Sequence, residues 1–313
     1  MTAPTTHEAP WQFASAWGAK GYISDLGGPV HWIDFGGPAD ATPMVFVHGL
    51  GGSHLNWALI GKALAEGRRA VAIDLHGFGL TPGRRTTSTV QANAKLLDRF
   101  LREVIGTPVI LVGNSMGGLI SIMQAAAHPE TVTGLVLVDP ALPMPKRLPD
   151  PGVAATFVVY AVPGLGEVSM RAMQRRLSPE ELVHRIINLC FADPGRANPQ
   201  MIEIGANLVR ERQQIARKEE SFLGAARSLM KLLMGRAKIE SLMDSVDVPV
   251  LLIHGEDDRL VPIASAQRVA DARPWWETSF LPGIGHTPQL EDPEQTIGIL
   301  RNWLASVPAL ATS

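Results

Sequence analysis

The chain contains little of several residue types, and each shortage excludes a class of protein. Cys190 is the single cysteine among 313 residues, so no disulfide can form within the chain. A chain without disulfides is typical of a reducing compartment, so we expect a cytoplasmic protein. Cys190 follows the apolar run 186–189 and has no base beside it, which favours a packing residue over a nucleophile.

An excess of charge of one sign is also missing. The 28 basic and 30 acidic residues leave a net charge of −2, and the basic residues cluster only in pairs. Binding of nucleic acid needs a concentrated basic face, so we expect no nucleic-acid partner. The chain has no H-E-x-x-H, no Cys/His cluster and no P-loop, and Gly77–Gly79 is too short for a dinucleotide fingerprint. We therefore expect no metal and no cofactor.

Long hydrophobic runs are absent as well. The uncharged run 151–166 is interrupted by Pro163 and Gly164 and falls short of the about 20 apolar residues that a membrane helix needs. The first ten residues carry Glu8 and no basic segment followed by an apolar one, so we expect no secretory signal. The sequence predicts a protein without a membrane span and does not indicate an oligomeric state.

Five continuous apolar runs of strand length are present, each followed by glycine or a polar residue. They are residues 44–47, 70–73, 109–112, 135–138 and 250–253, with a sixth strand expected at 277–281. Continuously apolar strands are typical of a parallel sheet that is covered on both faces. We expect the glycines and polar residues to gather at the carboxyl edge, where open α/β sheets build their sites.

Helical patterns separate these runs. A capping box at Ser88 predicts a helix towards residue 104, and further helices are expected over 116–127 and 293–304. The segment 141–247 breaks the alternation and is mostly helical in pattern, with Ser178 as a predicted N-cap and further helices over 199–217 and 219–234. We predict a core over 1–140 and 248–313, and a helical lid inserted over 141–247.

Residues 113–117, G-N-S-M-G, fit the pattern G-x-S-x-G. The pattern follows the strand 109–112 and precedes the helix 116–127, which is the context of a nucleophile elbow. The tight turn requires neighbours without bulk, and Gly113, Gly117 and Gly118 meet that requirement. The sequence therefore predicts Ser115 as a nucleophile at the sheet edge.

A serine hydroxyl needs a base and an acid partner to become a nucleophile. His286 follows the last predicted strand in a loop rich in Gly and Pro, and we expect it to be the base. The segment after residue 253 offers Asp258 as the acid, with Asp257 in reserve. Asp139, at the end of the strand 135–138, is a third possibility, although its Asp-Pro context favours a structural turn.

The backbone should stabilise the negative charge that develops on the substrate. We expect the N–H groups of Met116 and Leu50 to form the oxyanion hole, because the first follows the nucleophile and the second lies in a glycine-rich loop after an earlier strand. His48 is expected to brace that loop by hydrogen bonding. The backbone and side chains that we expect to border the substrate belong to Gly49, Gly51, Asn114 and Thr287.

Taken together, these motifs resemble the α/β-hydrolase superfamily in its lid-bearing branch. The matches are HGLGG (48–52), DLHGFG (74–79), GNSMGG (113–118), GEDDRLVP (255–262) and GHTPQLEDPE (285–294). The resemblance implies an α/β-hydrolase fold, with Asp258 as the acid and His286 as the base, and Glu291 as its downstream companion. Relatives that cut haloalkanes or epoxides carry Asp at the elbow, where this chain has Ser115.

The resemblance leaves the substrate open. Carboxylesterase action is the broader default for this machinery, and the methionines of the lid (144, 170, 173, 230 and 234) favour an apolar acyl or alcohol group. GNSMGG also resembles the elbow of the meta-cleavage-product hydrolases, which cut carbon–carbon bonds and of which many carry Trp where this chain has Thr287. Arg175, Arg176 and Arg185 could receive a substrate carboxylate in such a reaction. A ligand-binding protein with little turnover is the third hypothesis.

Overall fold

The computed structural model describes residues 3–143, 152, 159, 160, 162, 164–215 and 217–310. Nine strands form one sheet in the order β1-β2-β3-β5-β4-β6-β7-β8-β9, and every neighbouring pair from β5 to β9 is parallel. The strands are β1 (Thr6–Glu8), β2 (Lys20–Asp25), β3 (Pro29–Asp34), β4 (Met44–Val47), β5 (Ala70–Ile73), β6 (Val109–Asn114), β7 (Val132–Val138), β8 (Val250–Gly255) and β9 (Glu277–Leu281).

All six predicted strands are confirmed, and three of them are longer than the apolar runs that predicted them. The three antiparallel strands β1 to β3 were not predicted. The exposed fractions explain this for two of them, because β1 is exposed throughout and β2 alternates irregularly between buried and exposed side chains. Hydrogen bonding in the sheet stabilises β2 without an apolar pattern, since β2 pairs with β3 along its whole length.

The central strands are continuously apolar because both faces of the sheet are covered by helices. Val45 and Val47 of β4 belong to the core that includes α2, α3, α9 and α10, whereas Met44 and Phe46 belong to the opposite core with α1 and α12. These helices are α1 (Ala58–Leu64), α2 (Val90–Phe100), α3 (Met116–Ala127), α9 (Arg236–Asp244), α10 (Ile263–Ala272) and α12 (Pro293–Ser306). Alternate residues of one strand therefore bury into different cores.

The helix predictions are confirmed in kind and corrected at their ends. The helix α3 covers the predicted range, and α12 starts at Pro293 as expected. The predicted capping box at Ser88 is wrong, because Thr89 is the N-cap of α2 and accepts a hydrogen bond from the N–H of Ala92 at 3.2 Å. The helix then continues as a π-helical turn over Leu101–Ile105.

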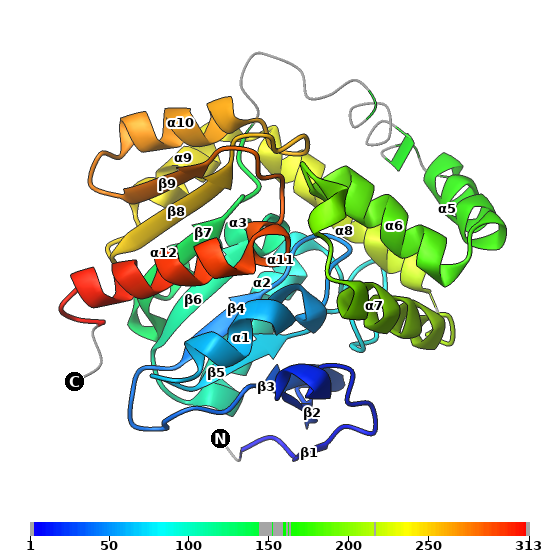
Figure 1. Ribbon diagram of the computed structural model, residues 1–313, viewed down its shortest axis with the longest axis horizontal. Helices are drawn as coiled ribbons and strands as arrows, with labels where there is room; N and C mark the ends of the chain where they lie inside the picture. The colour runs from blue at the N-terminus through cyan, green and yellow to red at the C-terminus, as the bar shows by residue number, and fades with distance from the viewer. Residues whose placement is uncertain are drawn as a thin grey trace.

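The helices α5 to α9 lie between β7 and β8 along the chain, and Figure 1 shows α5 to α8 gathered beside one end of the sheet. They are α5 (Leu165–Arg176), α6 (Pro179–Cys190), α7 (Pro199–Arg212), α8 (Lys218–Leu233) and α9. Ser178 caps α6, and both bonds of its capping box to Glu181 are present. We call residues 164–235 the helical insertion. Met144 and most of the uncharged run 151–166 lie outside the described residues.

None of the described helices combines the length and the apolar character that crossing a bilayer requires.

Candidate active site

Ser115 lies in the sharp turn between β6 and α3. Its backbone has φ of 54° and ψ of −118°, a region that residues with a side chain rarely adopt. A Cβ atom on Gly113 would come within 2.5 Å of the carbonyl of Gly117, and one on Gly117 within 2.2 Å of the carbonyl of Val47. The turn is therefore closed only because these positions lack a side chain, as the sequence predicts.

His286 and Asp258 are brought together from two loops at the same sheet edge. The Nδ1 of His286 donates a hydrogen bond to Oδ2 of Asp258 at 2.7 Å, and both side chains are buried. Burial opposes ionisation of Asp258, but the charge and the hydrogen bond of His286 outweigh it and lower the pKa of this carboxyl. The reserve candidate, Asp257, is exposed. The bond to Nδ1 fixes the imidazole tautomer and leaves Nε2 as the acceptor nitrogen.

The residue before Ser115 connects the elbow to the loop of His286. The Nδ2 of Asn114 donates to the carbonyl of His286 at 3.1 Å and to that of Val138 at 3.0 Å. The N–H of His286 donates to the carbonyl of Cys190 at 2.6 Å. The amide of Asn114, which we expected to border the substrate, thus holds the backbone at the end of β7 and in the loop of His286.

The glycine-rich loop after β4 lies beside the elbow because β4 and β6 are neighbours in the sheet. A Cβ atom on Gly49 would come within 2.9 Å of the Cβ of Ser115, so only glycine allows this approach. Among the described residues, no hydrogen bond uses the N–H of Leu50 or of Met116. Two backbone donors are therefore left beside the serine, at the positions expected for an oxyanion hole.

His48 braces this loop, as expected. Its Nδ1 donates to the carbonyl of Gly49 at 2.8 Å, and its Nε2 accepts from the N–H of Leu75 at 3.1 Å. Burial lowers the pKa of His48 to about 4, so the ring is neutral at pH 7. A neutral ring with both nitrogens occupied can hold a loop but has no free nitrogen with which to accept a proton.

The helical insertion is bonded to both loops that carry His286 and Asp258. The carboxylate of Glu291 accepts hydrogen bonds from the N–H groups of Gly285, Ala192 and Asp193 at 2.8 to 3.1 Å. Arg259, next to Asp258, donates to the carbonyl of Phe191 at 2.6 Å. The segment that follows α6 is therefore held from two sides at the site.

Other parts of the insertion approach the loops that follow β4 and β5. The ring of Phe222 in α8 lies 3.2 Å from where a Cβ of Gly51 would stand. Arg212 in α7 donates to the carbonyls of Gly77 and Gly79, the former at 3.0 Å. Thr287 is buried and its Oγ1 has no hydrogen-bond partner among the described residues.

Two groups of alternative site residues are not brought to Ser115 by any contact among the described residues. Burial raises the pKa of the Cys190 thiol to about 12, so it stays protonated, as expected for a packing residue. Arg175, Arg176 and Arg185 are exposed. Instead, Arg212 reaches the core loop at Gly77 and Gly79, and Arg196 reaches the core loop at Gly283; the sequence indicated neither.

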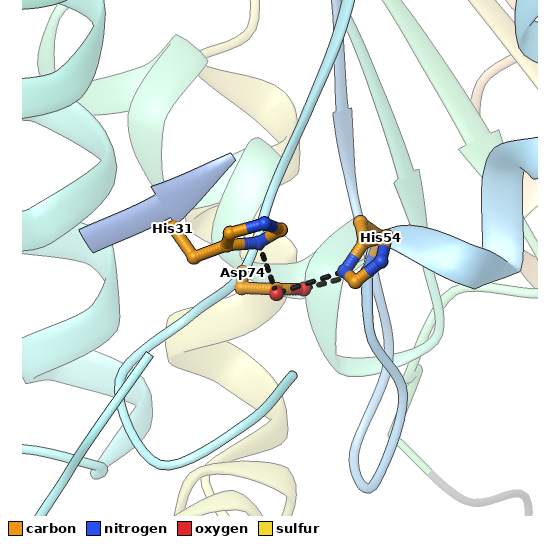
Figure 2. Close-up of side chains that lie close together, drawn as sticks. All are labelled: His31, His54 and Asp74. Atoms are coloured by element: carbon orange, nitrogen blue, oxygen red, sulfur yellow. Dashed lines mark hydrogen bonds and ion pairs between the residues drawn. The ribbon is translucent and has the colours of Figure 1, made fainter. Parts of the chain in front are cut away.

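A second buried cluster was missed in the sequence. Figure 2 shows His31 and His54 on either side of Asp74, with Nδ1–Oδ2 distances of 2.7 and 2.9 Å. The Asp74 carboxylate also accepts from the N–H groups of His54 at 2.6 Å and Leu80 at 2.8 Å. Burial opposes ionisation, yet the two histidines hold the pKa of Asp74 well below its usual range. Asp74 directly follows the apolar run 70–73, and this position was the available sequence signal for the cluster. The sequence pattern did not indicate the two histidines.

The fold and this site define a class. The chain belongs to the alpha/beta hydrolase family, whose sequence profile matches residues 44–299. It is similar to a pimeloyl-[acyl-carrier protein] methyl ester esterase of Aromatoleum aromaticum, 26% identical over 80% of this chain and 93% of the other. It is also similar to a 2-hydroxy-6-oxo-6-(2'-aminophenyl)hexa-2,4-dienoic acid hydrolase of Metapseudomonas resinovorans, 26% identical over 80% of each chain.

A solved structure supports the fold. The wild-type Cfl2 structure from Burkholderia cenocepacia has a TM-score of 0.78 with 22% identity, covering 96% of this chain and 99% of the other. Some curated relatives are longer. A dihydrolipoyllysine-residue acetyltransferase component of an acetoin cleaving system from Pseudomonas putida is 26% identical over 87% of this chain, and the chain spans 66% of its length.

Proposed function

We propose that this hydrolase cleaves carboxylic esters of small to medium, largely apolar substrates through an acyl-enzyme on Ser115. The observation that carries the proposal is the 2.7 Å bond from His286 to Asp258, at the same edge of the sheet as the strained Ser115. Such a pair supplies a base with a fixed tautomer, and a sharp turn presents the hydroxyl that it activates.

The first half of the reaction forms the acyl-enzyme. Ser115 Oγ attacks the acyl carbonyl while Nε2 of His286 takes its proton, and the N–H groups of Leu50 and Met116 bond the oxyanion. The tetrahedral intermediate collapses when His286 returns that proton to the leaving alcohol. Asp258 stays ionised throughout and stabilises the imidazolium.

The second half releases the acid. Water enters in place of the alcohol and gives a proton to His286 as it attacks the acyl carbonyl. Collapse of the second intermediate breaks the bond to Ser115 and returns the proton to its oxygen. We propose that the helical insertion acts as the lid over this site, because Phe222 approaches the Gly51 loop and the segment after α6 is bonded to the catalytic loops.

Carbon–carbon bond cleavage is the second candidate, favoured by the similarity to the aminophenyl-hexadienoic acid hydrolase. Aryl esters of graded acyl length and a vinylogous diketone acid separate the two candidates. Turnover of esters that is lost in Ser115→Ala supports the proposal, whereas a preference for the diketone acid by orders of magnitude overturns it. Ser245→Ala, at an exposed serine, is the matched control. Ligand binding without turnover of either substrate would favour a binding protein.

A further inference from the structure

A second carboxyl group is buried beside the pair formed by His286 and Asp258. Asp139 follows β7, the neighbour of β8 in the sheet, and its side chain is 0% exposed. One oxygen of Asp139, one of Asp258 and one ring nitrogen of His286 all lie within 4.8 Å of one another. Two carboxylates that are this close and this buried cannot both carry a charge without a large cost.

The hydrogen-bond donors are divided unequally between the two carboxyl groups. Asp258 accepts at Oδ1 from the N–H groups of Leu260 at 2.7 Å and Val261 at 3.0 Å, and at Oδ2 from His286. Asp139 accepts at Oδ1 from the N–H of Gly255 at 2.9 Å, while its buried Oδ2 has no partner among the described residues. The donors favour a charge on Asp258 and a proton on Oδ2 of Asp139.

Within the described part of the chain, no positively charged side chain contacts Asp139 to offset a charge on it. His254 is the nearest basic side chain, with Nδ1 at 3.7 Å from Oδ1 of Asp139, but its Nε2 donates to the carbonyl of Val261. Burial lowers the pKa of His254, which keeps this ring neutral. The guanidinium of Arg259 donates hydrogen bonds to backbone carbonyls of the insertion.

The remaining ionisable groups around Asp139 do not favour its charge either. Glu291 adds negative charge, and the Cys190 thiol stays protonated. Burial, followed by the charge of Asp258, raises the pKa of Asp139 well above its usual range.

The backbone of Asp139 has a φ of 42°, a left-handed conformation that Asn and Gly tolerate better than most residues.

We propose that Asp139 is a neutral carboxylic acid that donates its Oδ2 proton to the Asp258 carboxylate, and that it is a positioning residue for the Asp258–His286 pair. With this proton in place, His286 faces a single negative charge, and the hydrogen bond from Asp139 holds the Asp258 carboxylate in position. Loss of the proton at alkaline pH would add a second charge beside Asp258 and remove the donor. The catalytic part of this inference rests on the proposed function, whereas the protonation itself does not.

Infrared spectroscopy of the full chain tests the protonation without any substrate. At pH 7 the wild type should show the C=O stretching band of a buried protonated carboxylic acid, and Asp139→Asn should lose it. Asp34→Asn, at a partly exposed aspartate paired with Arg69, is the control that should keep the band. Absence of the band in the wild type, or its survival in Asp139→Asn, would overturn the proposal.

Two variants test the positioning role. Asn and Gly both tolerate the backbone of residue 139, but only Asn offers an N–H donor in place of the acid O–H. Asp139→Gly should lower kcat about tenfold with little change in KM, since a hydrogen bond to a charged group is lost. Asp139→Asn should stay close to the wild type at pH 7 and should lose the alkaline decline of the wild-type pH profile.

The outcomes for the protonation of Asp139 and for its positioning role can be told apart. Equal impairment of both variants with an unchanged pH profile would mean that Asp139 has only a structural role, and it would overturn the positioning inference. If no ester or diketone acid is turned over by the wild type, the proposed function fails, while the infrared band still decides whether Asp139 carries the proton.

Discussion

The protein buries two clusters of histidine and aspartate at the same edge of its sheet, and they differ in the ratio of the two residues. Around Asp74, one carboxylate accepts hydrogen bonds from two imidazoles and two backbone N–H groups. Around Asp258, two carboxyl groups lie beside His286, and this imidazole donates a hydrogen bond to Asp258 alone. In the first cluster, hydrogen-bond donors surround the single carboxylate. The second cluster contains one carboxyl group more than its donors can stabilise as a charged group.

This difference assigns a different task to each cluster. A carboxylate whose donors are all satisfied within the protein fixes the loops that supply them, here those after β4 and β5. An imidazole bonded through Nδ1 to a single carboxylate keeps its other nitrogen for chemistry. We therefore expect the Asp74 cluster to govern stability and the Asp258 cluster to govern turnover.

The largest expected effect is on the turnover of the second cluster. Asp258→Asn should lower kcat/KM for esters by about three to four orders of magnitude, because the amide favours the wrong tautomer of His286. The melting temperature of the variant should change little. Steady-state kinetics on an aryl ester checks the prediction, and a loss of less than tenfold would remove Asp258 from the proposed triad.

The next effect is on the folding of the first cluster. Asp74→Ala leaves the buried Nδ1 groups of His31 and His54 without an acceptor, and it should lower the free energy of unfolding by about 3 to 5 kcal/mol. Urea denaturation measures this change. Glu130→Ala, which removes an exposed partner of Arg102, is the control and should leave the midpoint unchanged. A similar midpoint for both variants would contradict the stabilising role.

The excess acid should also appear in the pH dependence of stability. Native Asp139 keeps its proton, whereas the unfolded chain releases it above about pH 3.8. The wild type should therefore lose stability as pH rises from that value towards the raised pKa of the native state. Asp139→Asn removes this loss and should gain relative stability by up to about 1.4 kcal/mol per pH unit. A constant difference between the two proteins across this range would contradict the assignment.

The first cluster should show the opposite slope, with a smaller effect. Burial is the main cause that lowers the pKa of His31, so the native ring resists a proton that the unfolded chain accepts below about pH 6.5. Stability should then fall as pH decreases through that value towards the lowered pKa. His31→Asn keeps a donor near the Nδ1 position and should flatten the decline. Denaturation midpoints from pH 7 to pH 5 measure the slope, and an unchanged slope would refute this origin.

Much of this arrangement could be predicted along the chain. Val109–Val112 followed by G-N-S-M-G predicts a strand, a sharp turn and a helix, and the structure has β6, a turn at φ of 54° and α3 in that order. Each of these signals is local, since apolar periodicity and glycine positions are properties of a few neighbouring residues. The strands β1 and β2 lack such a signal because they are wholly or partly exposed, whereas in β3 the buried polar side chain of His31 interrupts the apolar run.

The sequence by itself determined the parallel core strands, the elbow at Ser115 and the loops that carry Asp258 and His286. Only the tertiary structure placed Asp139 beside Asp258, surrounded Asp74 with His31 and His54, and set Glu291 between two loops. The reason is physical: a strand, a cap or a tight turn depends on residues close in the chain. Which buried acid meets which donor depends on the order and register of strands, and these are fixed only when the whole sheet forms.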